Sequence, residues 1–212
     1  MNLIKLSLIP FFILIFINNV ISQEIHPGLT DPGSLSSELK HQGNIVRAFL
    51  WNENLCENYI LYCETDAYNS GSDIPDGKNK EFYIYYYIVQ NGETKFVWKI
   101  NDFVKDCEFD LETHFINQAL TVTDLDDDGV NEIWTMYRFG CKSDVSPWPL
   151  KLIMYEGNEK YAIRGETRDY SQSYKKEEDS PKKIDKKFKT ADNRILDYAI
   201  NLWKRNNIPV SD

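Results

Sequence analysis

The chain has 212 residues, of which 33 are acidic and 24 are basic, so its formal net charge is −9 at pH 7. This length is sufficient for one domain with a substantial hydrophobic core. The acidic balance argues against nucleic acid or an anionic membrane surface as a partner, because both carry the same sign of charge. It suits an exported protein or one that holds cations.

The first 22 residues have the pattern of a secretory signal peptide. Lys5 is the only charged residue in this segment, an apolar run follows over residues 6–17, and cleavage is expected before Gln23. The apolar run is too short for a membrane span of about 20 residues. We therefore expect a protein that is secreted, periplasmic or held at the cell envelope, with no membrane span after cleavage. The alternative is a retained N-terminal anchor.

Residues 23–43 are predicted to form an extended lead-in, and residues 44–168 a β-rich domain. Alternating, β-branched and aromatic residues predict about eight strands, joined by turns such as Asn91-Gly92. The fold class is therefore mainly β, an antiparallel meander of blade-like hairpins with one C-terminal α-helix. The tyrosine-rich strand at 81–90 is interpreted as sheet interior, with a carbohydrate-stacking surface as the alternative. The predicted strands cover residues 45–51, 59–65, 81–90, 94–100, 118–123, 133–138, 150–155 and 160–165.

The C-terminal part is predicted to be a linker followed by a helix. Residues 169–189 are charged and polar, which is typical of a solvated linker. Residues 190–206 carry one apolar stripe at helical spacing, which we expect to pack on the sheet. The stripe consists of Ile195, Leu196, Ala199, Ile200 and Trp203.

The four cysteines all lie after the predicted signal peptide. An even number of cysteines in an oxidising compartment favours two disulfides, although four cysteines allow three connectivities. We prefer Cys56–Cys63, which would close a short local loop, together with Cys107–Cys141, which would join the segments on either side of residues 124–132. A zinc site is the alternative, but no Cys-x-x-Cys spacing occurs and the three histidines are scattered.

Residues 124–132 form the strongest candidate site, an acidic loop between two predicted strands. Carboxylates occur at positions 1, 3, 5 and 9 of this loop and a glycine at position 6, and Ca²⁺ prefers six to eight oxygen ligands. Position 12 is Thr135, so the loop is not an EF-hand. The alternative is a plain hairpin turn with solvated acids. The predicted calcium ligands are the side chains of Asp124, Asp126, Asp128 and Glu132 and the backbone carbonyl of Val130.

A second candidate site lies in the loop at residues 142–149. Trp148 stands between Pro147 and Pro149, which stiffen the loop, so its ring is a reasonable platform for stacking a sugar ring or an aromatic partner. Asp144 in the same loop is the accompanying candidate ligand residue. The alternative is that Trp148 caps the hydrophobic core, since tryptophan is buried on average but seldom completely.

The chain contains none of the common catalytic motifs. There is no Gly-x-Ser-x-Gly elbow, no His-Glu-x-x-His helix, no phosphate-binding glycine loop and no dinucleotide fingerprint. Two carboxylates suffice for glycoside hydrolysis, and an acidic sequence alone neither supports nor excludes that chemistry. We therefore favour a protein that is not an enzyme.

Two resemblances extend this interpretation. The strand, acidic loop and following strand resemble the calcium hairpins of FG-GAP and integrin-type repeats. Residues 123–137, the run Asp144-Val145-Ser146-Pro147, and residues 151–157 and 160–165 are similar to an exported flavobacterial family labelled surface polysaccharide biosynthesis protein. The similarity is best over residues 117–165, and the label implies a role in the cell envelope without specifying a reaction.

The function expected from these observations is that of an exported calcium-binding β-domain associated with cell-surface polysaccharide. Its role would be binding or assembly, with surface polysaccharide or an envelope protein as the partner. One alternative is a polysaccharide-acting enzyme that contains a structural calcium ion. The other is a purely structural envelope protein. Fold class alone does not decide among these three.

Overall fold

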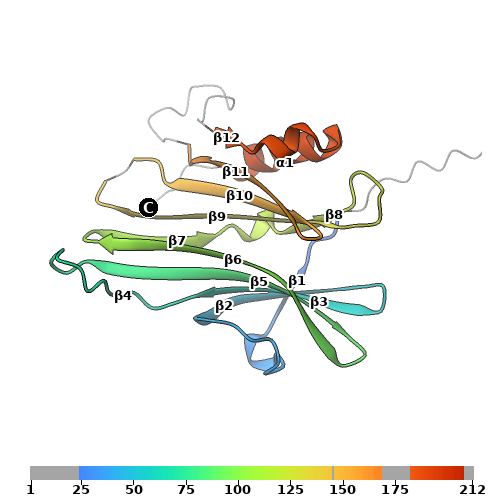
Figure 1. Cartoon of the computed structure of the whole chain (residues 1–212), viewed down its shortest axis with the longest axis horizontal. Coiled ribbons are helices and arrows are strands. Elements are labelled where there is room, and N and C mark those ends of the chain that lie inside the picture. Colours follow the sequence, from blue (N-terminus) through green and yellow to red (C-terminus); the bar gives the residue numbers. More distant parts are fainter. Residues whose placement is uncertain (1–23, 145, 169–181, 208–212) are drawn as a thin grey trace, which may run out of the picture.

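The structure is a computed structural model that describes residues 24–144, 146–168 and 182–207. Two antiparallel sheets lie face to face, and one helix covers the outer face of the second sheet (Figure 1). The predicted signal peptide and residues 169–181 of the predicted linker lie outside the described residues. In the described part of the chain, no helix has the length and apolar character that crossing a membrane requires.

The first sheet is formed by the N-terminal half of the chain. Its strands follow the order β1-β2-β3-β5, and both β4 and β6 also pair with β5. A short 3₁₀ helix, η1 (Pro32–Ser34), follows the first strand. The bounds are β1 (Gly28–Thr30), β2 (Asn44–Glu53), β3 (Cys56–Glu64), β4 (Tyr68–Asn69), β5 (Lys78–Gln90) and β6 (Glu93–Cys107).

The second sheet is formed by the C-terminal half. Its strands follow the order β12-β11-β10-β9, and β7 and β8 pair with opposite ends of β9. The 3₁₀ helix η2 (Asn117–Ala119) separates β7 from β8. The bounds are β7 (Asp110–Phe115), β8 (Thr121–Thr123), β9 (Glu132–Lys142), β10 (Pro149–Glu156), β11 (Glu159–Glu166) and β12 (Lys182–Ile184).

The mainly β class and the C-terminal helix are confirmed, but two details of the prediction are wrong. The described residues form twelve strands, not about eight. The strands also form two packed sheets, whereas a single blade-like meander was expected. The four unpredicted strands are β1, β4, β7 and β12, which have two to six residues each and therefore little periodic signal.

The main hydrophobic core fills the space between the two sheets. Aromatic side chains from opposite sheets contact one another there: Tyr62 stacks on Phe115 with centroids 4.3 Å apart, and Trp98 stacks on Tyr155 at 4.3 Å. Such pairs contribute about 0.5–1.5 kcal/mol each beyond the burial of their area. These contacts fix how the two sheets are aligned.

The tyrosine-rich strand β5 is buried on both faces. Phe82, Ile84 and Tyr86 face the core between the sheets, and the lead-in covers the opposite face. There the Gln42 amide donates a hydrogen bond to the Tyr85 hydroxyl at 3.0 Å, and the Tyr87 hydroxyl donates to the carbonyl of Lys40. The interpretation as sheet interior therefore holds for this strand. The lead-in is also more regular than expected, because β1 pairs with β2.

The helix α1 (Asn193–Asn206) packs on the outer face of the second sheet (Figure 1). Asp192 caps it by accepting a hydrogen bond from the Arg194 amide at 2.8 Å. Residues 182–189, which were expected to be linker, instead form β12 and the 3₁₀ helix η5 (Lys186–Lys189). Ile184 and Phe188 explain this difference, because both pack into the same apolar cluster as the helix.

One of the two preferred disulfides is present, and the prediction of the other is wrong. Cys107 and Cys141 are bonded, with a Cα–Cα distance of 5.5 Å, and join the end of β6 to β9. Cys56 and Cys63 are free and lie on the same strand, β3. Seven steps along an extended strand separate their Cα atoms by roughly 23 Å. A disulfide requires Cα atoms within about 7 Å of each other.

Candidate metal centre

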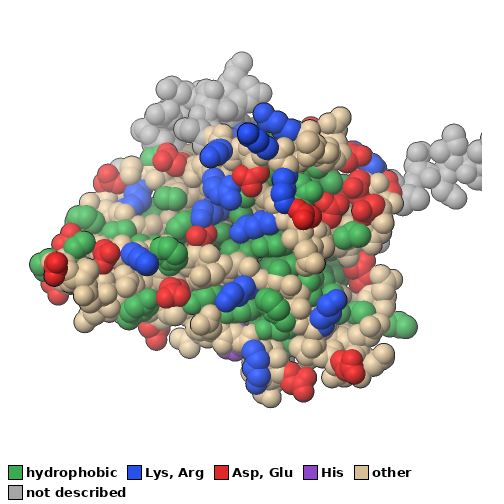
Figure 2. Space-filling model, viewed as in Figure 1, with side chains coloured by type: hydrophobic (Ala, Val, Ile, Leu, Met, Phe, Trp, Pro, Cys, Tyr) green, Lys and Arg blue, Asp and Glu red, His purple; other side chains and the backbone are tan. Residues whose placement is uncertain are grey.

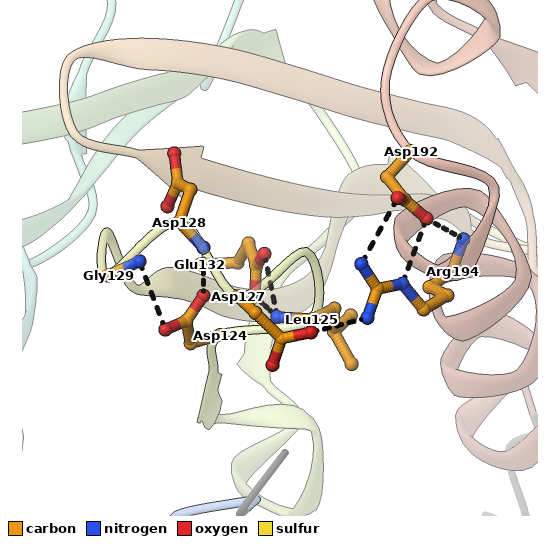
Figure 3. A network of polar contacts seen from close by, with 8 residues as sticks. All are labelled: Asp124, Leu125, Asp127, Asp128, Gly129, Glu132, Asp192 and Arg194. Atoms are coloured by element: carbon orange, nitrogen blue, oxygen red, sulfur yellow. Dashed lines mark hydrogen bonds and ion pairs between the residues drawn. The ribbon is translucent and has the colours of Figure 1, made fainter. Parts of the chain in front are cut away.

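The acidic loop connects β8 to β9 at one end of the sandwich, and backbone amides fix its shape (Figure 3). The Asp124 carboxylate accepts hydrogen bonds from the amides of Asp128 at 3.1 Å and Gly129 at 3.2 Å. Gly129 adopts a φ of 82°, a left-handed conformation that glycine tolerates without a Cβ clash. The loop therefore coils around the Asp124 side chain.

Three predicted ligands come together within this loop. Asp124, Asp126 and Asp128 each place one carboxylate oxygen within 4.8 Å of those of the other two. Alternate residues of the coiled loop point to the same side, which is why positions 1, 3 and 5 converge. The amide of Val130 donates to Asp128 at 2.7 Å. The role of the Val130 carbonyl as a ligand stays a prediction.

A second group of carboxylates joins the first through a shared residue. Asp126, Glu132 and Glu156 also place one oxygen each within 4.8 Å of the others. Glu132 begins β9 and Glu156 ends β10, and the two residues are directly opposite each other in the antiparallel register. Sequence reasoning missed Glu156, because its proximity depends on the pairing of β9 with β10 and not on any spacing within the loop.

Glu132 is held inside the protein by neutral donors. Its side chain is fully buried and accepts hydrogen bonds from the Thr123 hydroxyl at 2.6 Å and the Leu125 amide at 3.0 Å. Burial raises the pKa of Glu132 to about 7, the hydrogen bonds oppose this rise, and the charges of Asp126 and Glu156 add to it. Its two donors carry no positive charge, so they do not neutralise the ionised form.

Asp126 supplies an unsatisfied buried oxygen to this group. Within the described residues, Asp126 Oδ1 and Trp51 Nε1 are the buried side-chain polar atoms without a hydrogen-bond partner. Leaving such an atom unpaired costs about 1–3 kcal/mol, and more for a charged group. Asp126 also belongs to both groups of three carboxylates. Asp126 is therefore suitably placed to contribute a ligand oxygen to a cation.

Asp127 has a different role from its acidic neighbours. Its carboxylate accepts a hydrogen bond from Arg194 at 2.7 Å, and Arg194 also bonds Asp192 at the start of α1 (Figure 3). The side chain of Asp127 thus points toward the helix, away from the groups that hold the other acids. This agrees with its even position in the loop, which the ligand spacing leaves out.

The plain-turn alternative explains this loop less well. A solvated turn would keep its acids in water, whereas Glu132 is 0% exposed and Asp126 has a buried oxygen. Burial also raises the pKa of Glu156, with smaller contributions from the charges of the three loop aspartates. Like charges gathered with no cation between them are unfavourable. The cluster can hold a metal ion.

The second predicted site lies far from this cluster. Trp148 is half-buried, its ring is 4.8 Å from Lys142 Nζ, and its edge lies against Gly140 near the opposite end of β9 from Glu132. The ten steps from Glu132 to Lys142 span roughly 33 Å. Asp144 is exposed and accepts from Ser146. A metal ion in the acidic loop is thus too distant to contact this loop, and ligand binding there stays a prediction.

The candidate centre thus consists of the carboxylates of Asp124, Asp126, Asp128, Glu132 and Glu156, contributed by one loop and by two paired strands. Their chemistry is that of oxygen ligands with a high negative charge. Comparisons of the chain with protein-family models, with curated proteins and with solved structures found no match.

Proposed function

We propose that this protein is an exported calcium-binding β-sandwich module that acts at the cell surface as a binding or assembly protein for polysaccharide, without catalysing a reaction. The observation that carries the calcium proposal is Asp126, which belongs to both carboxylate groups and has an unsatisfied buried oxygen. A bound cation would coordinate that oxygen and neutralise the surrounding acids.

Calcium fits this donor set better than Zn²⁺ or Mg²⁺. All five side chains offer hard carboxylate oxygens, which suit Ca²⁺ and Mg²⁺. Zinc prefers nitrogen and sulfur ligands, and no histidine or cysteine belongs to either group. Mg²⁺ usually keeps several waters and binds only one or two carboxylates. A cluster of five carboxylates therefore favours Ca²⁺.

Export and a surface role rest on separate support. The predicted signal peptide implies passage out of the cytoplasm. The Cys107–Cys141 bond is the kind of linkage that forms and persists in oxidising compartments. The polysaccharide connection rests on the resemblance described above, and Trp148 with its flanking prolines remains the proposed sugar-contacting residue. Because that residue is remote from the acidic loop, we expect calcium to stabilise the fold without ordering the Trp148 loop.

Calcium is expected to raise the melting temperature of the mature protein after EDTA treatment. At a concentration 100 times its Kd, a ligand that binds only the folded state adds about 2.7 kcal/mol. For a domain of this size that corresponds to an increase of about 5–10 °C. Asp126→Asn is expected to abolish most of this increase, because it removes the charge of the residue shared by both groups. Differential scanning calorimetry with Ca²⁺ and with Mg²⁺ measures the effect.

Asp127→Asn provides the matched control in the same loop. This carboxylate binds Arg194 and belongs to neither group, so the variant is expected to keep the full calcium response. An equal response in the Asp126→Asn and Asp127→Asn variants, or none in the wild-type protein, would contradict the proposal. A response to Mg²⁺ as large as that to Ca²⁺ would contradict the choice of ion.

A further inference from the structure

The two sheets do not cover each other completely. The first sheet ends at β6, and this strand lies over β10, as shown by the stacking of Trp98 on Tyr155 and by the 2.6 Å contact between Asp102 and Lys151. The second sheet continues beyond β10 with β11 and β12. Ala162 on β11 is still buried in the core between the sheets, whereas the inward-facing residues on either side of it and on β12 are partly or fully exposed.

The register places four basic residues on the inward-facing side of β10, β11 and β12, at the margin of the first sheet. Lys151 pairs with Arg164, and Arg164 pairs with Lys183, so these three form a row across β10, β11 and β12. Lys160 lies on the same face of β11, because residues two and four apart along a strand point the same way. Figure 2 shows Lys and Arg side chains gathered over β10 and β11. We call Lys151, Lys160, Arg164 and Lys183 the basic strip.

Two carboxylates neutralise only part of the basic strip. Asp102 bonds Lys151 at 2.6 Å and also accepts from the Tyr137 hydroxyl at 2.8 Å. Asp185 bonds Arg164 at 2.7 Å. Both acids therefore already have a cationic partner of their own.

Lys160 is a cation of the basic strip that has no direct ion pair among the described residues. It is partly buried, and among the described residues its ammonium makes no hydrogen bond or ion pair, with the Tyr155 ring centroid 5.9 Å away. Burial lowers the pKa of Lys160, the neighbouring Arg164 and Lys151 lower it further, and Asp102 and Asp185 oppose them. Removing an ammonium from water without an anionic partner is unfavourable. An anion bound beside Lys160 would remove this cost.

We propose that the basic strip binds an oxyanion, with Lys160 as the central contact and Arg164 and Lys183 on either side. The ligand class is the sulfate, phosphate or carboxylate group of an acidic sugar chain. Only the choice of sugar as the source rests on the proposed surface function; the oxyanion site itself does not depend on calcium. The strip is a local positive region on a chain of net charge −9, which favours a short anionic ligand over a long polyanion.

Isothermal titration calorimetry with a sulfated hexasaccharide, a neutral cello-oligosaccharide and sodium sulfate tests this proposal. The sulfated sugar is the main probe because polyuronates bind calcium themselves. The wild-type protein is expected to bind it, and Lys160→Gln is expected to weaken binding on the order of tenfold, the effect of losing one charge-assisted hydrogen bond. Lys99→Gln is the matched control, since Lys99 is exposed on the outer face of the first sheet, over Tyr83.

Two further variants distinguish a failure of the basic strip from a failure of folding or of the calcium site. Lys183→Gln changes an exposed residue of the strip and is expected to fold normally and weaken binding severalfold. Asp126→Asn is expected to keep oxyanion binding, so failure of the calcium site and failure of the basic strip are separate results. Unchanged affinity in Lys160→Gln and Lys183→Gln, or no binding of either anion by the wild-type protein, would overturn the proposal. Equal affinity for sodium sulfate and the hexasaccharide would confirm the oxyanion site and overturn the sugar as its source.

Discussion

Replacing both Cys107 and Cys141 with serine is expected to lower the free energy of unfolding by about 4 kcal/mol. The bond closes a loop with a sequence separation of 34 residues, and a crosslink of that span restricts the unfolded chain by about this amount. It also joins β6 of the first sheet to β9 of the second. Urea denaturation of the oxidised wild-type protein and the double variant measures the difference.

The control for this prediction is Cys56→Ser, which changes a free and partly exposed thiol on β3. A surface substitution of this kind is expected to change the stability by less than about 0.5 kcal/mol. A loss below about 1 kcal/mol in the double variant would show that packing between the sheets already supplies the constraint. If Cys56→Ser lowered the free energy of unfolding as much as the double variant does, the loss would be due to thiol chemistry and not to the crosslink.

The disulfide and the acidic loop lie at opposite ends of the same strand, β9. Glu132 begins β9 beside the carboxylate cluster, and Cys141 lies near its end. Sites more than about 10 Å apart with no shared partners usually contribute additively to stability. The calcium-dependent increase in melting temperature is therefore expected to persist in the disulfide variant. The two features are therefore expected to stabilise the fold independently.

Much of the fold was predictable because strand periodicity is a local property. Each predicted strand has enough alternating or β-branched residues to be recognised on its own. The division into two sheets was not predictable in this way, because it depends on contacts such as Trp98 with Tyr155, which are 57 positions apart in the sequence numbering. The preference for a Cys56–Cys63 bond failed for a related reason. The turn lies at Asn54 and Leu55, before Cys56, so both cysteines fall on one extended strand.

The candidate site likewise contains residues that local spacing predicts and residues that only long-range strand pairing brings together. Asp124, Asp126 and Asp128 converge because their spacing within one coiled loop brings them together, and that spacing is visible in the sequence. Glu156 joins the cluster only through the pairing of β9 with β10. The basic strip was also invisible to local patterns, since Lys151, Arg164 and Lys183 come from three strands. A long-range register is required to bring such residues together.

The metal-free protein is expected to lose stability as the pH rises from about 4.5 to about 7. The folded-state pKa of Glu132 is raised from 4.5 to about 7, chiefly by burial. Between these values the unfolded chain has released the proton while the folded chain still holds it, so raising the pH favours unfolding. The penalty is absent below pH 4.5 and complete above pH 7. Its size is on the order of 3 kcal/mol, at 1.36 kcal/mol for each pKa unit.

Glu132→Gln isolates this contribution from the other titrating groups. His114 titrates in the same range, and its pKa is lowered by burial and by Arg138, so its own effect opposes that of Glu132. The unfolding free energies of the wild-type and variant proteins are measured in EDTA at pH 5 and pH 8. The contribution of His114 is the same in both proteins, so it cancels in their difference. The free energy of unfolding of the variant is expected to increase relative to that of the wild-type protein as the pH rises. A difference that does not change with pH would show that Glu132 titrates normally in the folded protein.

Calcium is expected to counteract the loss of stability of the wild-type protein at high pH. The ion binds the carboxylate and not the protonated acid, so calcium and the proton compete for Glu132. Calcium should therefore raise the melting temperature more at pH 8 than at pH 5.5, and Glu132→Gln should reduce both the increase and its dependence on pH. If calcium stabilised the protein equally at both values, the ion would have to be held without Glu132, by the three loop aspartates alone. The pH dependence of the calcium response thus distinguishes a site confined to the loop from one that also includes the paired strands β9 and β10.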